Sequence, residues 1–288
     1  MLKRTLTSLL LIPPVIYLIG WSPEWLFVLA VAAAVVLALR EYFALCRAMG
    51  FKVFSVIGYA GAVALCLAQS LPTSARSFFF LLLVVVLLLL ISTLALQPSM
   101  ELKDYLVATS VTIFGTLYVG LTLSCLILIR FPMFFVGRFW VHGKMPSSGL
   151  GAGPYSLFLL FLVIWAGDIC AYLVGRSIGR TPFFARISPR KTWEGALAGF
   201  AGSLIAAWAF AHWFWKTADV KTVILLAACI ALAGQTGDLV ESAIKRGANQ
   251  KDSGTLLPGH GGFLDRIDSL LFAAPTLWLA ISFLGYFS

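Results

Sequence analysis

Long apolar runs, separated by short polar stretches, occupy most of the chain. A helix that crosses a bilayer needs about 20 largely apolar residues, and somewhat fewer when its ends reach into the interface. By this criterion the sequence predicts nine membrane-spanning helices, at residues 5–20, 25–40, 53–71, 76–96, 105–129, 155–176, 195–215, 222–242 and 263–286. The alternating ten-residue pattern of membrane-spanning strands is not visible. We therefore expect an all-α integral membrane protein, a polytopic helical bundle.

The composition supports this class. With 60% hydrophobic and only 11% charged residues, the chain does not resemble a soluble globular protein. Five cysteines stand singly in apolar stretches, which favours buried thiols over disulfides or a zinc site. The net charge is +9, but the basic residues form no block interleaved with exposed aromatic residues, so we expect no nucleic-acid partner. Anionic membrane lipid or a phosphorylated substrate fits the charge better.

The distribution of Lys and Arg predicts the orientation, because cytoplasmic loops carry an excess of both. With nine spans and a cytoplasmic amino terminus, most of the 21 Lys and Arg residues lie on the cytoplasmic side. We interpret the first apolar run as a retained span and residues 131–153 as an external loop in the interface. The chain then divides into amino-terminal helices, residues 1–150, and a carboxyl-terminal catalytic part, residues 151–288.

Acidic side chains are distributed unevenly along the chain. Four of the twelve lie near predicted span ends in the amino-terminal part and look like ordinary boundary charges: Glu24, Glu41, Glu101 and Asp104. Five others lie within or at the ends of late apolar helices: Asp168, Asp238, Glu241, Asp265 and Asp268. An ionised group at mid-membrane costs roughly 2.5–3.5 kcal/mol on insertion scales, so this cluster needs a compensating role.

The spacing of these five carboxylates favours a metal site. Asp238 and Glu241 are three residues apart, and residues at that spacing share a helix face. Asp265 and Asp268 have the same spacing. Like charges in a low dielectric repel unless a cation lies among them, and oxygen ligands without Cys or His suit Mg²⁺. The alternative is a set of ion pairs that hold helices together, for instance between Asp168 and a nearby arginine.

A polar loop between the two late helices adds phosphate-binding chemistry. Lys245, Arg246 and Lys251 can hold phosphates, and Gly261 and Gly262 allow backbone N–H groups to approach an anion before the last helix. A metal beside phosphate ligands is typical of phosphoryl or nucleotidyl transfer. A basic loop that is merely solvated is the alternative.

A second polar patch precedes it, at residues 187–195. Arg190 and Lys191 are candidates for nucleotide phosphates. Ser188 or Thr192 could instead cap the following helix, with Glu194 in its first turn.

Residues 242–269, which we call the signature segment, resemble the signature of the phosphatidate cytidylyltransferases, or CDP-diacylglycerol synthases. The matching positions are Ser242, Ile244, Lys245, Arg246, Lys251, Asp252, Gly254, Leu257, Pro258, His260, Gly261, Gly262, Asp265, Arg266, Ile267 and Asp268. Residues 167–175, 188–195 and 237–242 also resemble that family. This chain has Arg190 where the family usually has Lys. The change conserves the positive charge, but a guanidinium group contacts a phosphate with a different geometry than an ammonium group.

The resemblance implies Mg²⁺-dependent transfer of a cytidylyl group from CTP to phosphatidic acid, giving CDP-diacylglycerol and pyrophosphate. It assigns catalysis to Asp238, Lys245, Asp265 and Asp268. The expected metal ligands are Asp238, Asp265 and Asp268, supported by Glu241 and Asp168. The expected substrate-binding residues are Ser188, Arg190, Lys191, Thr192, Arg246, Lys251, His260, Gly261 and Gly262. The sequence leaves open a second cation and a homodimer.

Three other functions fit the sequence less well. A cation transporter would place acids near the bilayer centre of a repeated unit, and no repeat is visible. A polyprenol or dolichol kinase is argued against by the full signature, and a structural scaffold gives no reason for the charged, glycine-flanked loop. We expect a bacterial inner-membrane enzyme whose active site faces the cytoplasm.

Overall fold

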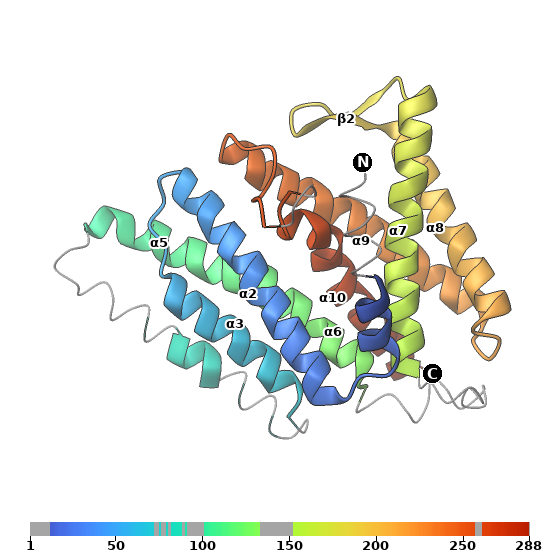
Figure 1. Cartoon of the computed structure of the whole chain (residues 1–288), viewed down its shortest axis with the longest axis horizontal. Coiled ribbons are helices and arrows are strands. Elements are labelled where there is room, and N and C mark those ends of the chain that lie inside the picture. Colours follow the sequence, from blue (N-terminus) through green and yellow to red (C-terminus); the bar gives the residue numbers. More distant parts are fainter. Residues whose placement is uncertain are drawn as a thin grey trace. The chain divides into compact units, whose positions relative to one another are not determined.

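Helices form nearly all of the computed structural model, which describes residues 12–71, 75, 79, 82–87, 90, 101–132, 152–256 and 261–287 (Figure 1). The helices are α2 (Glu24–Ala48), α3 (Ser55–Gln69), α5 (Leu102–Gly115), the π-helix η1 (Thr116–Leu121), α6 (Thr122–Arg130), α7 (Ala152–Ile178), α8 (Trp193–Trp213), α9 (Val220–Gly247) and α10 (Leu264–Phe287). Two short strands, β1 (Pro182–Phe184) and β2 (Ser188–Thr192), form an antiparallel pair. The predicted all-α membrane class is confirmed.

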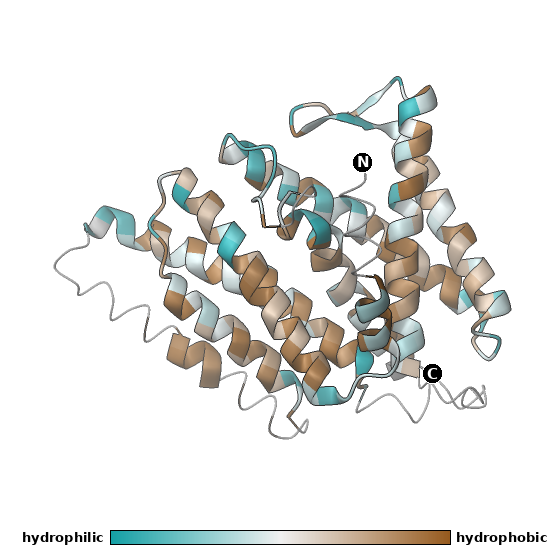
Figure 2. Ribbon diagram, in the orientation of Figure 1, coloured by the Kyte–Doolittle hydropathy of each residue, from teal (hydrophilic) through white to brown (hydrophobic). Residues whose placement is uncertain are grey.

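Six helical stretches in the described part of the chain are long and apolar enough to cross a membrane. They are Glu24–Ala48, Lys103–Arg130, Ala152–Ile178, Trp193–Trp213, Val220–Gly247 and Leu264–Leu284. Each overlaps one predicted span. Figure 2 shows apolar residues along these helices and hydrophilic residues at their ends.

Three of the nine predicted spans are not among these six. Helix α3 is apolar but has 15 residues. The spans predicted at 5–20 and 76–96, and the predicted external loop, lie largely outside the described residues. The number of nine spans and the orientation therefore stay predictions.

The chain forms two compact units. The first comprises residues 1–18, 22–128 and 244–267, and the second comprises residues 19–21, 129–243 and 268–288. This grouping differs from the predicted division at residue 150, because most of the signature segment belongs with the amino-terminal helices. Helices α9 and α10 each contribute residues to both units.

In the first unit, close contacts fix the position of α2. A Cβ atom on Gly58 of α3 would collide with the ring of Phe43 on α2. The Tyr42 hydroxyl donates a hydrogen bond to the Val111 carbonyl of α5 at 3.2 Å. Phe43 itself is fully buried. Helix α2 is therefore held in place by its neighbours. Glu41, which directly precedes Tyr42, faces the signature segment.

In the second unit, α7 and α8 pack through small residues, as membrane helices do when their backbones approach closely. A Cβ atom on Gly199 of α8 would lie 2.9 Å from the Gly167 carbonyl oxygen of α7. One turn further along α8, the Ser203 hydroxyl donates to the Val163 carbonyl at 2.8 Å. This packing holds the hairpin that connects the two helices in a defined place.

Candidate active site

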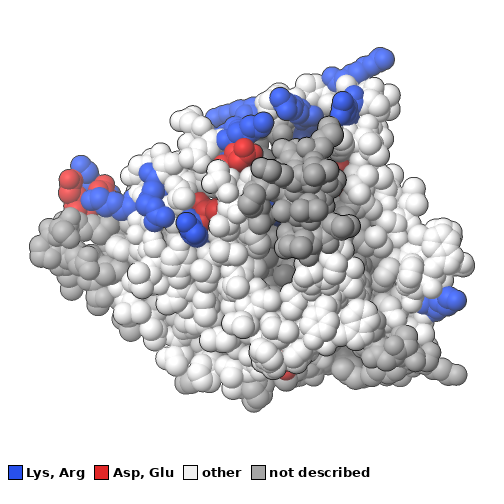
Figure 3. All heavy atoms as spheres, viewed as in Figure 1, with Lys and Arg blue, Asp and Glu red and all other residues white. Residues whose placement is uncertain are grey.

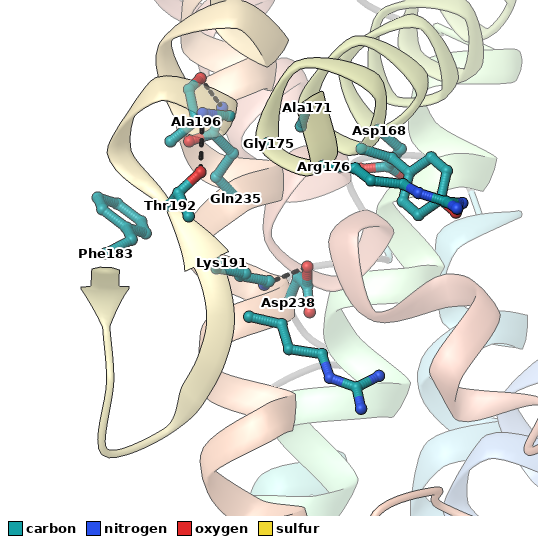
Figure 4. A pocket seen from close by; sticks show the side chains of 13 residues that line it. Asp168, Ala171, Gly175, Arg176, Phe183, Lys191, Thr192, Ala196, Gln235 and Asp238 are labelled. Carbon is teal, nitrogen blue, oxygen red and sulfur yellow. Dashed lines mark hydrogen bonds and ion pairs between the residues drawn. The ribbon is translucent and has the colours of Figure 1, made fainter. Parts of the chain in front are cut away.

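The β1–β2 hairpin carries Lys191 to helix α9. There its ammonium group forms an ion pair with the carboxylate of Asp238, and each side chain is 30% exposed (Figure 4). The structure therefore brings together two residues that the sequence singled out from separate segments.

The hairpin is fastened to the beginning of α8. The Thr192 hydroxyl accepts a hydrogen bond from the Gly195 N–H at 3.2 Å, so the predicted helix cap is confirmed. The Glu194 carboxylate accepts from the N–H groups of Arg180 and Thr181, at 3.2 Å each. These bonds close the base of the hairpin and fix the chain direction at Lys191.

Within the polar patch at residues 187–195, residues Ser188–Thr192 form strand β2, which the sequence analysis did not predict. Strand β2 contains Pro189, which lacks an N–H and is tolerated only at a sheet edge. β2 is a strand because it pairs with β1, which lies outside the polar patch, so the local sequence of the patch does not indicate it.

A cavity of about 660 Å³ lies in the second unit beside this ion pair. Its polar and aromatic lining comes from α7, the hairpin and α9: Asp168, Tyr172, Arg176, Phe183, Arg190, Lys191, Thr192, Gln235 and Asp238. Three cations and two carboxylates thus share the cavity with two aromatic rings. Such a lining can hold a phosphate next to a flat or apolar group.

Hydrogen bonds orient several of these side chains. Arg176 donates to the Tyr172 hydroxyl at 2.8 Å, and both residues lie on the same side of α7. The Gln235 amide of α9 donates to the Ala196 carbonyl of α8 at 3.1 Å. The cavity walls are therefore tied to one another, and a ligand meets side chains that are already positioned.

The first unit contains a separate polar cluster around Asp265. One of its carboxylate oxygens accepts from the Lys245 ammonium at 2.6 Å, and the other accepts from the N–H groups of Ser253 and Gly262 at 3.0 Å each. The side chains of Lys245 and Asp265 are only 10% and 9% exposed. We expected the Gly262 N–H to face a phosphate, and in this structure the anion that it binds is the Asp265 carboxylate.

The chain matches the model of the Cytidylyltransferase family over residues 2–284. This chain belongs to that family. It is 34% identical over 268 residues to a protein of Synechocystis named phosphatidate cytidylyltransferase, with 88% of this chain and 87% of the relative covered. It is 34% identical over 269 residues to phosphatidate cytidylyltransferase 5, chloroplastic, of Arabidopsis thaliana, with 90% and 66% covered.

A Bacillus subtilis relative of the same name is 43% identical over 130 residues, which are 44% of this chain and 47% of the relative. The resemblance seen in the motifs is thus confirmed at the level of the family. The long apolar helices and the bacterial relatives together make this cytidylyltransferase-family chain a multi-pass membrane protein.

The remaining predicted site residues occupy varied environments. Glu241 is fully buried in α9, and Asp268 accepts from the Ser269 N–H at 2.6 Å in α10. Arg246 donates to the Gln250 carbonyl at 2.9 Å. Lys251 is exposed and Ser188 is half-buried. Gly261 has φ +82°, a conformation that favours glycine, whereas His260 lies outside the described residues.

In the part of the chain that the structure describes, no three His, Cys, Asp or Glu side chains form a group that could hold a metal ion. The convergence of five carboxylates therefore stays a prediction. Mg²⁺ is commonly held by one or two carboxylates, water and substrate phosphates rather than by a cage of protein ligands. Asp168 and Asp238, which line the same cavity, form a donor set of that kind.

One residue at the Asp265 cluster was missed by the sequence interpretation. Glu41, taken as an ordinary boundary charge, is 6% exposed and hydrogen-bonds to the signature segment. Its partners lie more than 200 positions away along the chain, so no local spacing could reveal them. The available signal was an acid inside a long helix that is mainly apolar.

Proposed function

We propose that this chain transfers a cytidylyl group from CTP to phosphatidic acid, forming CDP-diacylglycerol and pyrophosphate. The observation that carries the proposal is the cavity of the second unit, where Lys191, Asp238 and two arginines surround a space of about 660 Å³. Relatives over nearly the whole chain are named phosphatidate cytidylyltransferase, which supports this choice of substrates.

The reaction depends on how the lipid phosphate is aligned with the α-phosphorus of CTP more than on a general base. An oxygen of the lipid phosphate attacks the α-phosphorus of CTP while the bond from that phosphorus to the bridging oxygen breaks, and pyrophosphate leaves. The attacking oxygen is already anionic, so the barrier lies in charge repulsion and geometry. Arg176, Arg190 and Lys191 reduce this repulsion, and Asp238 orients the Lys191 ammonium. Phosphate binding by Lys245, Arg246 and Lys251, which belong to the first unit, stays a prediction.

Helix α7 offers the lipid a path to the cavity. Beside Tyr172 and Arg176, which line it, Ile169 and Leu173 are each 59% exposed on the same span. An exposed apolar helix surface in a membrane faces acyl chains. We place the acyl chains of phosphatidic acid along this surface and its phosphate at the Arg176 guanidinium.

We also propose that the reaction requires Mg²⁺. Asp168 and Asp238 would hold it together with nucleotide phosphates, with Glu241 and Asp268 as further ligands. When bound, Mg²⁺ supplies positive charge that stabilises the departing pyrophosphate. Asp265 already accepts three hydrogen bonds, from Lys245 and from two backbone N–H groups, so at most one oxygen lone pair is left for a cation.

The charge distribution supports a cytoplasmic active site. Lys and Arg side chains gather at the end of the second unit where the hairpin lies (Figure 3). Basic residues mark the cytoplasmic side of membrane proteins, and CTP is a cytoplasmic nucleotide. We therefore propose that the cavity opens to the cytoplasm from a bacterial inner membrane.

Pyrophosphate release by the detergent-purified protein tests the proposal. We expect turnover that needs CTP, phosphatidic acid and Mg²⁺ together, that stops in EDTA, and that falls at least about tenfold in Asp238→Asn. Asp219→Asn, at the opposite end of α9 and exposed, is the matched control with unchanged turnover. A folded wild-type protein that releases no pyrophosphate, or releases it without the lipid, contradicts the proposal.

A further inference from the structure

Glu41 of α2 binds residues in both described parts of the signature loop, by which we mean residues 251–256 and 261–264. One carboxylate oxygen accepts from the Ser253 hydroxyl and from the Leu264 N–H, at 2.8 Å each. The other oxygen accepts from the Phe263 N–H at 3.0 Å. Three hydrogen bonds to one buried carboxylate join Ser253, Phe263 and Leu264 to a single point on α2.

The loop backbone surrounds this carboxylate at contact distance. A Cβ atom on Gly254 would lie 2.5 Å from one Glu41 oxygen, and one on Gly262 would lie 2.7 Å from the other. The space that Glu41 takes therefore explains Gly254, whereas at Gly262 an added Cβ atom would collide first with the Ser253 hydroxyl and then with Glu41. The site favours a carboxylate because all three of its printed partners, the Ser253 hydroxyl and the Phe263 and Leu264 N–H groups, are donors.

Ser253 links Glu41 to the residues proposed for catalysis. Its hydroxyl donates to Glu41 and accepts from the Asp265 N–H at 3.3 Å, which uses its one donor and one of its two acceptor sites. Its own N–H donates to the Asp265 carboxylate, which in turn accepts from Lys245. A change at Glu41 therefore reaches Lys245 through two intermediate groups.

We propose that Glu41 is a positioning residue, which anchors the signature loop and thereby sets where Asp265 and Lys245 lie. Its effect on turnover rests on the proposed function, whereas the anchoring does not. The acid belongs to the amino-terminal helices, to which the sequence assigned no part in the site.

Glu41→Gln removes the charge at nearly constant volume. In either orientation of the amide, an NH₂ group replaces one oxygen and faces at least one backbone N–H donor. Hydrogen bonds to charged groups are strong, and their loss opens local structure by roughly tenfold to a hundredfold. Glu101→Gln is the matched control, because Glu101 is an exposed acid that pairs with Lys103 on the surface of the same unit.

Hydrogen exchange of the full-length protein in detergent measures the anchoring without reference to activity. In Glu41→Gln we expect exchange at Ser253, Phe263 and Leu264 to rise at least about tenfold while α3 stays protected. We expect Ser253→Ala to give a smaller rise and to add little to Glu41→Gln, since both act on one network. Unchanged exchange at these amides, or a rise spread evenly over the unit, would overturn the proposal.

Turnover measured on the same samples tests the consequence for the reaction. We expect kcat to fall at least about tenfold in Glu41→Gln and to stay unchanged in Glu101→Gln. Faster local exchange with full turnover would overturn the positioning role. A wild-type protein without any cytidylyl transfer would refute the proposed function, and the exchange data would still decide whether Glu41 anchors the loop.

Discussion

Two ion pairs of equal length allow a direct test of how burial sets the cost of breaking a charge pair. Lys245–Asp265 and Lys103–Glu101 both have N···O separations of 2.6 Å. The first pair is 10% and 9% exposed, and the second is 75% and 65% exposed. For charges at the same separation, Coulomb attraction is about fourfold stronger at an effective dielectric constant of 20 than in water. The buried pair should therefore be the stronger one.

We expect Lys245→Met to lower the free energy of unfolding by about 3–5 kcal/mol, because it leaves the Asp265 carboxylate buried without its cation. Lys103→Met should lower it by less than about 1 kcal/mol, since its partner stays in water. Equilibrium unfolding in mixed detergent micelles measures both changes under the same conditions.

The double variant Lys245→Met, Asp265→Asn gives the sharper result. The Asn oxygen can still accept an N–H from the loop, and positions 245 and 265 then leave no unpaired charge buried. We therefore expect the double variant to be more stable than Lys245→Met alone by about 1–3 kcal/mol. Equal losses at Lys245 and Lys103, or additive losses in the double variant, would refute the reasoning.

Three further predictions concern the second unit. Lys191→Met should lower pyrophosphate release at least about tenfold, whereas Arg186→Met at the exposed hairpin turn should not; equal effects would show that only overall charge matters. Gly199→Leu should lower the free energy of unfolding by about 1–3 kcal/mol, because α7 leaves no room for a side chain, whereas Ala201→Leu on the exposed face of α8 should be nearly neutral. Hydrogen bonds from the Thr222 hydroxyl and N–H hold the pKa of Asp219 below its ordinary value. These hydrogen bonds therefore stabilise the fold above about pH 4, and the stabilisation is lost as the pH falls through the lowered pKa. In unfolding measurements between pH 5 and pH 3, we expect the free energy of unfolding of Asp219→Asn to fall less than that of the wild-type protein.

The sequence by itself determined the helical membrane class and the family. Apolar length alone predicts a span, because every backbone polar group in lipid must be satisfied within its own helix. Six predicted spans therefore recur as helices long enough to cross a membrane. The signature segment also carried its information locally, and its Lys245 and Asp265 form one cluster.

Only the tertiary structure decided which charged groups meet. Lys191 pairs with Asp238, and Glu41 binds the signature loop, across separations that leave no periodic trace in the sequence. The β2 strand likewise depends on a partner outside its own segment. The physical reason is the same in each case: a hydrogen bond or ion pair between distant segments is set by how helices pack, and packing is a property of the whole fold rather than of any local pattern.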